Sequence, residues 1–230
     1  FYDLRVPEVM EEQIEMARQF GIYGFCFYYY WFDGKRLLEK PLDMFLENKN
    51  MDFNFCVCWA NENWTRRWDG QDREILIQQN HSPEDDLAFI KDVSRYLSDP
   101  RYIRINGKPL LIIYRPRIFP DIKTSIDSWR DYFRKEYNEE LCMAMVQTFG
   151  DNDPRDFGFD FAIEFPPHNV APVNLTAEIK NPEFNGKAFD TGSIIRKAKN
   201  KLSKVDYNLF RGVMLMWDNT PRKGAFGEMY

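Results

Sequence analysis

The sequence of 230 residues is poor in the groups that many metal and nucleophile chemistries require. It contains only two histidines, His81 and His168, which lie too far apart for an H-x-x-x-H zinc pair. It has no G-x-S-x-G nucleophile elbow, and it lacks the motifs G-x-G-x-x-G and G-x-x-x-x-G-K-[ST] that bind nucleotide phosphates. The sequence therefore predicts no metal site, and it argues against a serine hydrolase and against a doubly wound nucleotide-binding sheet.

Charge and hydropathy argue against two further classes of partner. The formal net charge of −5 is spread along the chain without a basic block, so we expect no nucleic-acid partner. No apolar run approaches the roughly 18 residues that cross a bilayer, so we expect no transmembrane segment in this chain. The chain starts with Phe1 rather than Met, and no signal peptide is visible.

The four cysteines form neither a disulfide pattern nor a zinc pattern. Cys26, Cys56 and Cys58 lie in apolar, strand-like runs and Cys142 opens another, while a lone C-x-C lacks the usual zinc spacing. We interpret all four as buried free thiols. Such thiols favour a reducing compartment and hence a cytoplasmic location.

Hydrophobic periodicity predicts alternating helices and strands. Helices are expected over 7–20, 41–47, 82–97, 122–137 and 193–202. Strands are expected over 23–32, 53–59, 110–114, 141–147, 159–164 and 213–217. Asn106-Gly107 predicts a hairpin turn, and residues 169–190 read as a long loop.

This element order indicates an α/β fold with a mainly parallel sheet. Without a phosphate loop, a (β/α)8 TIM-like barrel fits better than a doubly wound sheet. Since about six of the eight strands are found, we expect a partial barrel. It would be one domain over residues 1–230 that lacks about one strand at each end.

Aromatic residues make up 17% of the chain, and many of them stand with polar residues at predicted strand ends. Reactive groups of a (β/α)8 barrel gather at the carboxyl ends of its strands. Those ends supply Tyr28, Tyr30, Trp31, Trp59, Asn61, Glu62, Asn63, Trp64, Tyr114, Arg115, Gln147, Glu164, His168, Trp217 and Asp218. Sugar rings have apolar C–H faces and a rim of hydroxyls, so aromatic walls with such polar partners predict a carbohydrate ligand.

Three carboxylates in this set are candidates for catalysis. Glu62 lies between two asparagines directly after a buried strand, which is an unusual place for a solvated loop charge. Glu164 lies near the end of FDFAIEF, where burial would suit a general acid; the alternative is a carboxylate that holds the loop after it. Asp218 follows the last predicted strand, where Asp-Asn is also common turn chemistry.

Structural alternatives exist for the binding candidates as well. Trp64 could anchor a loop, Arg66 could pair with Asp69 or Asp72 at the surface, and His168 could serve loop hydrogen bonding. Neighbouring strand residues point to opposite faces, so the row from Tyr28 to Tyr30 must send at least one ring into the core.

Long blocks of the sequence closely resemble the WbsX proteins, bacterial polysaccharide-biosynthesis proteins that are assigned as glycosyltransferases and related to glycoside hydrolase family 99. The blocks are YDLRVPEV (2–9), GIYGFCFYYYWFDGKRLLEKP (21–41), FCVCWANENWTRRWDG (55–70), DPRYIRINGKPLLIIYRP (99–116), VQTFG (146–150) and DFGFDFAIEFPPH (156–168). The likeness continues more loosely through MLMWDNTPR at 214–222.

The resemblance implies a (β/α)8 barrel that acts on a glycosidic linkage during assembly of bacterial O-antigen or capsule, in the cytoplasm or at the inner-membrane surface. Its substrate would be an oligosaccharide or polysaccharide. The sugar-facing wall that it implies consists of Tyr30, Trp31, Trp59, Asn61, Glu62, Trp64 and Arg66. In the related glycosidases a late Asn-Glu-Trp-type segment supplies catalytic carboxylates. This sequence has no Glu-Trp pair, so no catalytic role carries over.

Three functions follow as hypotheses. A glycosyltransferase would use a nucleotide-sugar donor, although the one D-x-D spacing, at 151–153, reads as a polar turn. A glycoside hydrolase or transglycosidase would pair Glu62 with Glu164, with carboxyl groups about 5 Å apart for retention or roughly 6.5–9.5 Å for inversion. A barrel that keeps only the sugar wall would bind carbohydrate without catalysis. No other cofactor is expected.

Overall fold

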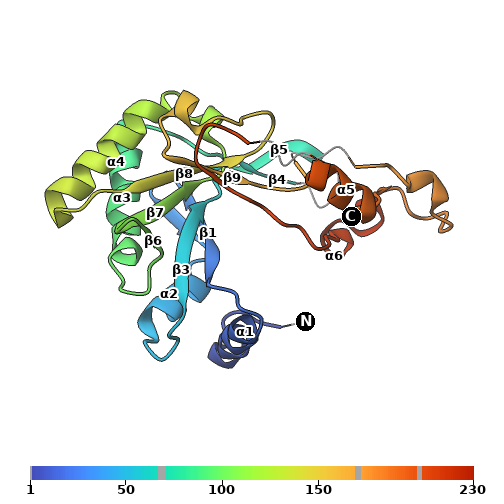
Figure 1. Cartoon of the computed structure of the whole chain (residues 1–230), viewed down its shortest axis with the longest axis horizontal. Helices are drawn as coiled ribbons and strands as arrows, with labels where there is room; N and C mark the ends of the chain where they lie inside the picture. The colour runs from blue at the N-terminus through green and yellow to red at the C-terminus, as the bar shows by residue number, and fades with distance from the viewer. Residues whose placement is uncertain (1, 67–70, 169–171, 201–203) are drawn as a thin grey trace. The chain divides into compact units, whose positions relative to one another are not determined.

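The computed structural model describes residues 2–66, 71–168, 172–200 and 204–230 (Figure 1). The chain separates into two compact units. The first comprises residues 1–62, 79–145 and 154–160, and the second comprises 63–78, 146–153 and 161–230. A single domain over the whole chain, which the sequence suggests, stays a prediction.

The first unit is built on a mainly parallel sheet. Its strands are β1 (Gly24–Phe32), β2 (Lys35–Leu37), β3 (Asn54–Trp59), β6 (Arg104–Ile105), β7 (Lys108–Ile113) and β8 (Cys142–Gln147), which ends in the second unit. β1, β3, β7 and β8 are parallel neighbours in that order, while β2 pairs with β1 and β6 with β7 in antiparallel fashion. The carboxyl ends of β1, β3 and β7 therefore lie along one edge of the sheet.

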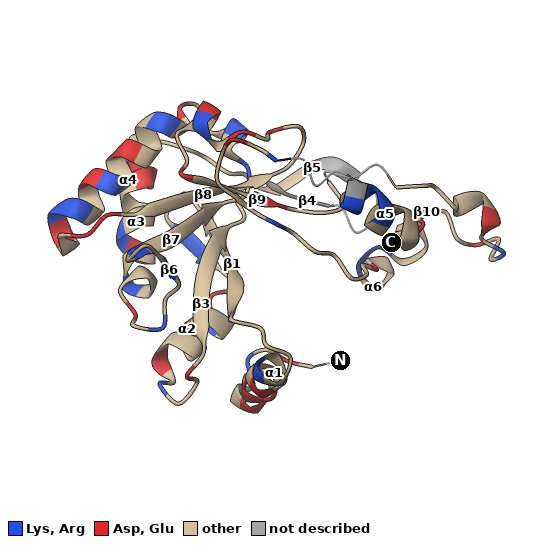
Figure 2. Cartoon of the chain, viewed as in Figure 1, with Lys and Arg blue, Asp and Glu red and all other residues tan. Residues whose placement is uncertain are grey.

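Four helices belong to the first unit: α1 (Pro7–Gln19), α2 (Lys40–Glu47), α3 (Pro83–Leu97) and α4 (Ile122–Tyr137). α3 and α4 pack side by side (Figure 1). α3 begins at Ser82, whose side chain accepts a hydrogen bond from the Asp85 amide. Phe89 and Ile90 of α3 and Trp129 of α4 are fully buried. Charges of both signs run along the rest of α4, as an amphipathic surface helix requires (Figure 2).

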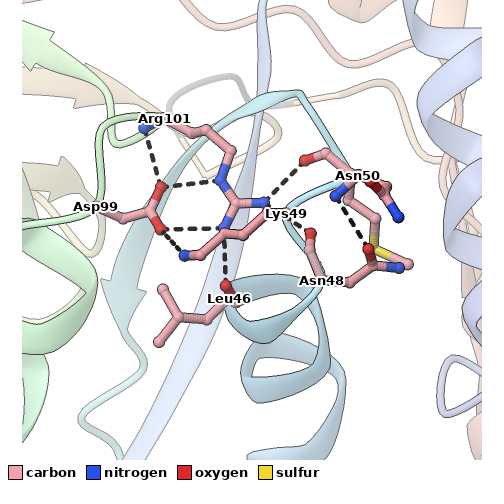
Figure 3. Close-up of polar contacts among 7 residues, drawn as sticks. Leu46, Asn48, Lys49, Asn50, Asp99 and Arg101 are labelled. Atoms are coloured by element: carbon pink, nitrogen blue, oxygen red, sulfur yellow. Dashed lines mark hydrogen bonds and ion pairs between the residues drawn. The ribbon is translucent and has the colours of Figure 1, made fainter.

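Arg101 joins the end of α2 to the chain that leads into β6 (Figure 3). Its guanidinium donates to both carboxylate oxygens of Asp99, at 2.8 and 3.0 Å, and to the backbone carbonyls of Leu46, Asn48 and Met51. Lys49 donates to Asp99 at 2.7 Å. The last carbonyls of a helix have no hydrogen-bond donor within the helix. The planar guanidinium of Arg101 supplies donors to carbonyls at the end of α2.

The second unit consists of short elements. They are β4 (Trp64–Arg66), β5 (Gln71–Ile77), β9 (Phe161–Glu164), β10 (Lys187–Ala188), α5 (Thr191–Asn200), β11 (Leu209–Phe210), α6 (Thr220–Lys223) and β12 (Glu228–Met229). β4 pairs antiparallel with β5, whereas β9 pairs with β11 and β10 with β12 in parallel. α5 has a basic side, which is visible in Figure 2.

The structure confirms the α/β fold and the mainly parallel sheet. The five predicted helices and the first five predicted strands are present within a few residues of their expected bounds. The Asn106-Gly107 hairpin is confirmed by backbone φ values of 51° and 80°, which suit the tight turn between β6 and β7. Within the described residues the sheet does not close into a barrel.

Two local predictions are wrong, and one hairpin was not predicted. The strand expected at 213–217 is not formed; the strand that pairs with β9 lies earlier, at Leu209–Phe210, because Gly212 turns its amide toward the Glu164 carboxylate and ends the pairing. The loop at 169–190 holds a 3-10 turn at Thr176–Glu178 and strand β10. The hairpin of β4 and β5 was not foreseen, since its polar, charged sequence lacks the alternation that marks a strand.

Candidate functional site

The carboxyl ends of β3 and β7 are fastened together by one buried asparagine. The Asn61 side chain accepts from the Arg115 amide at 2.8 Å and donates to the Arg115 carbonyl at 2.9 Å. Asn61 is fully buried, and its side-chain amide makes the two hydrogen bonds to Arg115 that the backbone of a neighbouring strand would otherwise make. This junction fixes the chain on either side of it, where Glu62 and Tyr114 lie.

Glu62 and Arg115 form an ion pair at this junction. The Arg115 Nη1 donates to Glu62 Oε1 at 2.5 Å, and the two side chains are 18% and 27% exposed. The pair is therefore partly open to solvent and presents a carboxylate acceptor beside guanidinium donors. Such a combination can bind neighbouring hydroxyl groups of one polar ligand.

Three tyrosines share one face of the sheet, and Tyr114, one of them, directly precedes Arg115. We call Tyr28, Tyr30 and Tyr114 the tyrosine face. Tyr28 and Tyr30 are two residues apart on β1, with ring centroids 6.1 Å apart. Tyr114 follows β7, and its hydroxyl is near enough to act electrostatically on Tyr28. Tyr28 is 49% exposed, whereas Tyr30 and Tyr114 are half-buried.

The phenol of Tyr28 is held in its protonated form. Desolvation raises its pKa first, and the neighbouring Cys58 and Tyr114 add to the rise. A protonated phenol can both donate and accept a hydrogen bond. The tyrosine face therefore combines flat apolar rings with a hydroxyl group, that of Tyr28, which remains a donor over the physiological pH range.

Trp31 and Trp59 do not belong to this face, which corrects the expectation that they line the ligand site. They are 4% and 0% exposed, and the ring of Trp59 stacks on Phe89 of α3 with centroids 4.0 Å apart. Trp31 donates from its indole nitrogen to Asp85 at 2.8 Å. Strand alternation explains the difference: residues 29, 31 and 59 point to the helix side, and 28 and 30 to the other. Tyr29 is the ring of its row that enters the core, at 1% exposure.

A group of buried ionisable residues lies where α3 begins. Burial raises the pKa of Asp86 to about 6, although a hydrogen bond from Ser125 opposes the rise. Burial also raises the pKa of Asp85, whose Oδ1 accepts from Trp31 and from the Gly34 amide at 2.9 Å. These contacts fasten the turn after β1 to α3, so Asp85 supports the site from behind rather than facing it.

In the second unit, Glu164 is engaged on both oxygens. Arg211 donates to its Oε1 at 2.7 Å and the Gly212 amide donates to its Oε2 at 3.0 Å. A Cβ at position 212 would lie 2.5 Å from the Glu164 carbonyl oxygen, so this approach requires glycine. Glu164 thus fastens the segment after β11 in the second unit. Its assignment as a general acid stays a prediction.

The other candidates of the second unit also have structural contacts. Gln147 is buried and donates to the Asn152 carbonyl at 2.9 Å and to the Tyr207 hydroxyl at 3.1 Å. His168 is exposed, and its ring stacks near that of Phe165 with centroids 5.6 Å apart. These contacts leave the binding roles of Gln147 and His168 as predictions.

Trp217 and Asp218 lie beyond the strand they were expected to end. The ring of Trp217 is 45% exposed and stacks on Tyr230, with centroids 5.5 Å apart. Asp218 is exposed and accepts from the Thr220 amide at 2.8 Å, which starts the short helix α6. This is the turn chemistry that the sequence left open as the alternative for Asp218.

The polar stretch after Glu62 belongs to the second unit. Asn63 is exposed, and Trp64 is half-buried and pairs with Ile77 across the β4–β5 hairpin. Arg66 ends β4, but its side chain lies outside the described set, as do residues 67–70. Their part in a ligand site stays a prediction.

Among the described residues, no group of three or more His, Cys, Asp or Glu side chains is placed to hold a metal ion. Asp151, of the D-x-D spacing, is only 3% exposed. None of the described helices is both long enough and apolar enough to cross a membrane.

Comparison with known proteins gives a family. The sequence profile of the family described as Glycosyltransferase WbsX matches residues 1–230. The chain belongs to the Glycosyltransferase WbsX family. This confirms the resemblance seen in the sequence blocks.

Two curated relatives, both called "Uncharacterized protein WxcX", come from Xanthomonas campestris pv. campestris strains B100 and ATCC 33913. They are 45% and 44% identical to this WbsX family member over 232 residues, a match that spans all of this chain but 33% of each relative. The chain thus spans about a third of the length of these relatives.

A solved structure called "Glycoside hydrolase-like protein" superposes with a TM-score of 0.57. The match covers 97% of this chain and 67% of that chain at 13% sequence identity. At this identity the likeness concerns the fold alone.

The sequence missed two features of the site. The double hydrogen bond between Asn61 and Arg115 links residues 54 positions apart, so no local pattern signals it. The role of Asp85 behind the turn after β1 was missed for the same reason, although an Asp in the first turn of a capped helix is a visible signal of an N-terminal contact.

Proposed function

We propose that this chain is a carbohydrate-active domain with a saccharide site at the carboxyl edge of the first unit's sheet. One observation carries the proposal: Tyr28, Tyr30 and Tyr114 share one face beside the partly exposed ion pair of Glu62 and Arg115. Aromatic rings beside hydrogen-bonding charges match the two kinds of surface on a sugar. Membership of the WbsX family supports the same ligand class.

Each residue has a role in this site. The rings of the tyrosine face pack against C–H surfaces of the sugar, and their hydroxyls donate to its oxygens. Glu62 accepts from sugar hydroxyls and Arg115 donates to sugar oxygens, while Asn61 positions both by holding the Arg115 backbone. Since Asn61 is buried, it acts through Arg115 rather than on the ligand.

The family description favours glycosyl transfer as the reaction. Our proposal places this transfer in the assembly of bacterial O-antigen or capsule. The acceptor is an oligosaccharide or polysaccharide, and the donor is a nucleotide sugar whose phosphates require cations. Arg115 supplies one at this edge. On this proposal the domain folds as a partial (β/α)8 barrel and works in the bacterial cytoplasm or at the inner-membrane surface.

A second function, glycoside hydrolysis or transglycosylation, is favoured by the fold likeness to the glycoside hydrolase-like structure. It requires two carboxyl groups facing one anomeric carbon. Glu62 and Glu164 are our candidates, although they belong to different units, and Asp218 is the third. A non-catalytic saccharide-binding domain is the remaining alternative.

The experiment is a glycan array of bacterial surface oligosaccharides probed with the chain and with Glu62→Gln. Exposed Glu12 of α1 gives the matched control, Glu12→Gln. We expect selective binding by the chain and the control, and weaker binding by Glu62→Gln, because a neutral amide no longer pairs with Arg115. Equal binding by all three proteins, or none by any, would contradict the proposed site.

Turnover of the bound oligosaccharide then separates the reactions. A transferase extends it only when a nucleotide sugar is added, and a hydrolase shortens it without a donor. A loss of turnover in Glu62→Gln larger than its weaker binding explains would assign Glu62 to catalysis, whereas weakened binding with unchanged turnover of the bound oligosaccharide would assign it to the sugar wall. Binding without any turnover supports the non-catalytic alternative.

A further inference from the structure

Three cysteine side chains meet on the same sheet face as the tyrosines. Cys26 of β1 is the register partner of Cys56 on the adjacent parallel strand β3, and Tyr28 is the partner of Cys58. Side chains two residues apart on a strand point to the same face, so all three thiols lie on the face that carries Tyr28. The thiols of Cys56 and Cys58 both hydrogen-bond the Cys26 sulfur.

The three thiols differ in their access to solvent. Cys26 is exposed, which corrects the expectation that all four cysteines are buried, while Cys56 and Cys58 are each 4% exposed. The difference follows from sheet position. Over Gly24–Tyr29, β1 pairs with β3 on one side, and β2 joins it only from Tyr30 onward. Cys26 therefore lies on the outer of the two strands.

The hydrogen bonds also set which thiol ionises first. Two S–H donors stabilise a negative charge on Cys26 and lower its pKa well below the ordinary thiol value, although burial of the surroundings opposes this. The same contacts, together with burial, raise the pKa of Cys56 and Cys58. The group thus has one accessible thiolate held by two protonated donors.

We propose that Cys26 is a thiol modification site that exchanges with small disulfides and is resolved by Cys56. The cluster geometry carries this: an exposed cysteine on the same sheet face as two buried ones, one of them its register partner across a strand pair. The ligand class is a low-molecular-weight disulfide such as glutathione disulfide. The inference does not depend on the saccharide site.

The exchange proceeds in two balanced steps. The Cys26 thiolate attacks one sulfur of glutathione disulfide, an S–S bond forms between Cys26 and glutathione, and glutathione thiolate leaves and takes a proton. The Cys56 thiolate, having lost its proton to water, then attacks the Cys26 sulfur and releases the second glutathione. In sum two protein thiols are oxidised to one disulfide, and one glutathione disulfide is reduced to two thiols.

The first step prepares the second. The hydrogen bond to the Cys26 sulfur is the largest cause of the raised pKa of Cys56. Once Cys26 carries a mixed disulfide, its negative charge is gone and this cause disappears. Cys56 then ionises more readily and becomes the attacking thiol.

Strand geometry selects Cys56 over Cys58. Adjacent strands lie about 4.8 Å apart, so register partners fall inside the roughly 4.4–6.8 Å Cα separation of disulfides. Cys58 is two residues further along β3. That offset places its Cα about 8 Å from that of Cys26, which is too far for a bridge without backbone movement.

The test is treatment of the chain with glutathione disulfide at pH 7, followed by trypsin and mass spectrometry. Cys26, the Cys56–Cys58 pair and Cys142 fall in three separate tryptic peptides, 19–35, 50–66 and 136–155. Cys142 is the internal control, because it is 3% exposed and burial raises its pKa to about 11. Its slow reaction also reports that the protein stays folded.

We expect peptides 19–35 and 50–66 to become cross-linked at least about tenfold faster than Cys142 is modified, since the thiolate is the reacting form. Cys56→Ser should stop at the glutathione adduct on Cys26, while Cys58→Ser should still cross-link. The serine hydroxyl keeps a donor toward Cys26, so each variant leaves the first step in place.

Two results would overturn the proposal. One is modification of Cys26 no faster than Cys142 in the folded wild-type chain, which needs no variant. The other is a cross-link that persists in Cys56→Ser, or a wild-type adduct on Cys26 that never resolves.

Discussion

Asn61 and Arg115 exchange two hydrogen bonds, at 2.8 and 2.9 Å, between the side chain of one and the backbone of the other. They join the carboxyl ends of two neighbouring parallel strands at the point where Glu62 meets the Arg115 guanidinium. The candidate site therefore rests on a buried amide that makes no contact with a ligand itself.

Asn61→Ala tests this junction. It leaves the Arg115 amide and carbonyl without their partner in a buried place, so the free energy of unfolding should fall by about 1–3 kcal/mol. Asn61→Asp is the matched control: its protonated carboxyl can accept from the Arg115 amide and donate to the Arg115 carbonyl, so at acidic pH this variant should retain more stability than Asn61→Ala. Urea unfolding followed by tryptophan fluorescence measures both. If, at acidic pH, Asn61→Ala lost less unfolding free energy than Asn61→Asp, the stabilising role of this junction would be contradicted.

Trp59→Phe separates core packing from binding. The smaller ring loses contact with Phe89 and the hydrogen bond to the Trp31 carbonyl at 3.3 Å, so the variant should be less stable by about 1–3 kcal/mol. Its affinity for saccharides should stay within about twofold, because Trp59 is buried and does not belong to the tyrosine face. For comparison, a loss of about 1.4 kcal/mol in binding free energy would be tenfold. A large loss of saccharide affinity at unchanged stability would return Trp59 to the sugar wall.

Arg101→Ala tests the network at the end of α2. Removal of the guanidinium leaves the buried Asp99 with Lys49 as its one cationic partner among the described residues, and three backbone carbonyls lose their hydrogen-bond donor. We therefore expect the free energy of unfolding to fall by about 3–5 kcal/mol. Arg134→Ala is the control, because that arginine forms exposed ion pairs, which contribute little to stability. Equal losses in both variants would refute the structural role of Arg101.

Asp86→Asn makes a pH-dependent prediction. The raised pKa of Asp86, to about 6 from 3.8, means that the folded state binds its proton more tightly than the unfolded state. Its ionisation therefore costs stability as pH rises through that window. The variant lacks this cost, so its stability relative to wild type should rise by on the order of 2 kcal/mol between pH 4 and 7.

His81 acts in the opposite sense within the same window. Burial lowers its pKa to about 4 from 6.5, so the folded state favours the neutral imidazole. The contribution of His81 to stability therefore rises as pH increases from about 4 to 6.5. The effect is common to wild type and Asp86→Asn, and it cancels in their difference. Melting temperatures of both proteins across the window provide the measurement, and a constant difference would refute a buried, proton-binding Asp86.

The sequence predicts the first unit well because its strands and helices follow strong local patterns. The runs at 23–32 and 53–59 are apolar on both faces, and Ser82-Pro83 marks a helix start that the structure reproduces. It also places Glu62 and Arg115 at strand ends on the same edge of the sheet, although it does not predict the ion pair between them.

Side-chain direction is what the sequence alone could not give. Trp31 and Trp59 have the composition of a sugar wall, yet alternation sends them under α3, and only the register between β1 and β3 shows this. The exposure of Cys26 follows from the strand pairing, because β2 covers β1 only from Tyr30 onward, and such pairing is a long-range fact. The run at 213–217 looks like a strand, but pairing with β9 ends before it.

The most direct test of the central claim is a calorimetric titration of the chain with an oligosaccharide selected on the array, using wild type, Tyr30→Ala and Tyr23→Ala. Tyr23 is 68% exposed and lies outside the tyrosine face. We expect Tyr30→Ala to weaken binding by about 3- to 10-fold, the value of one aromatic contact, and Tyr23→Ala to leave it unchanged. Equal affinity in all three proteins would contradict a saccharide site on the tyrosine face.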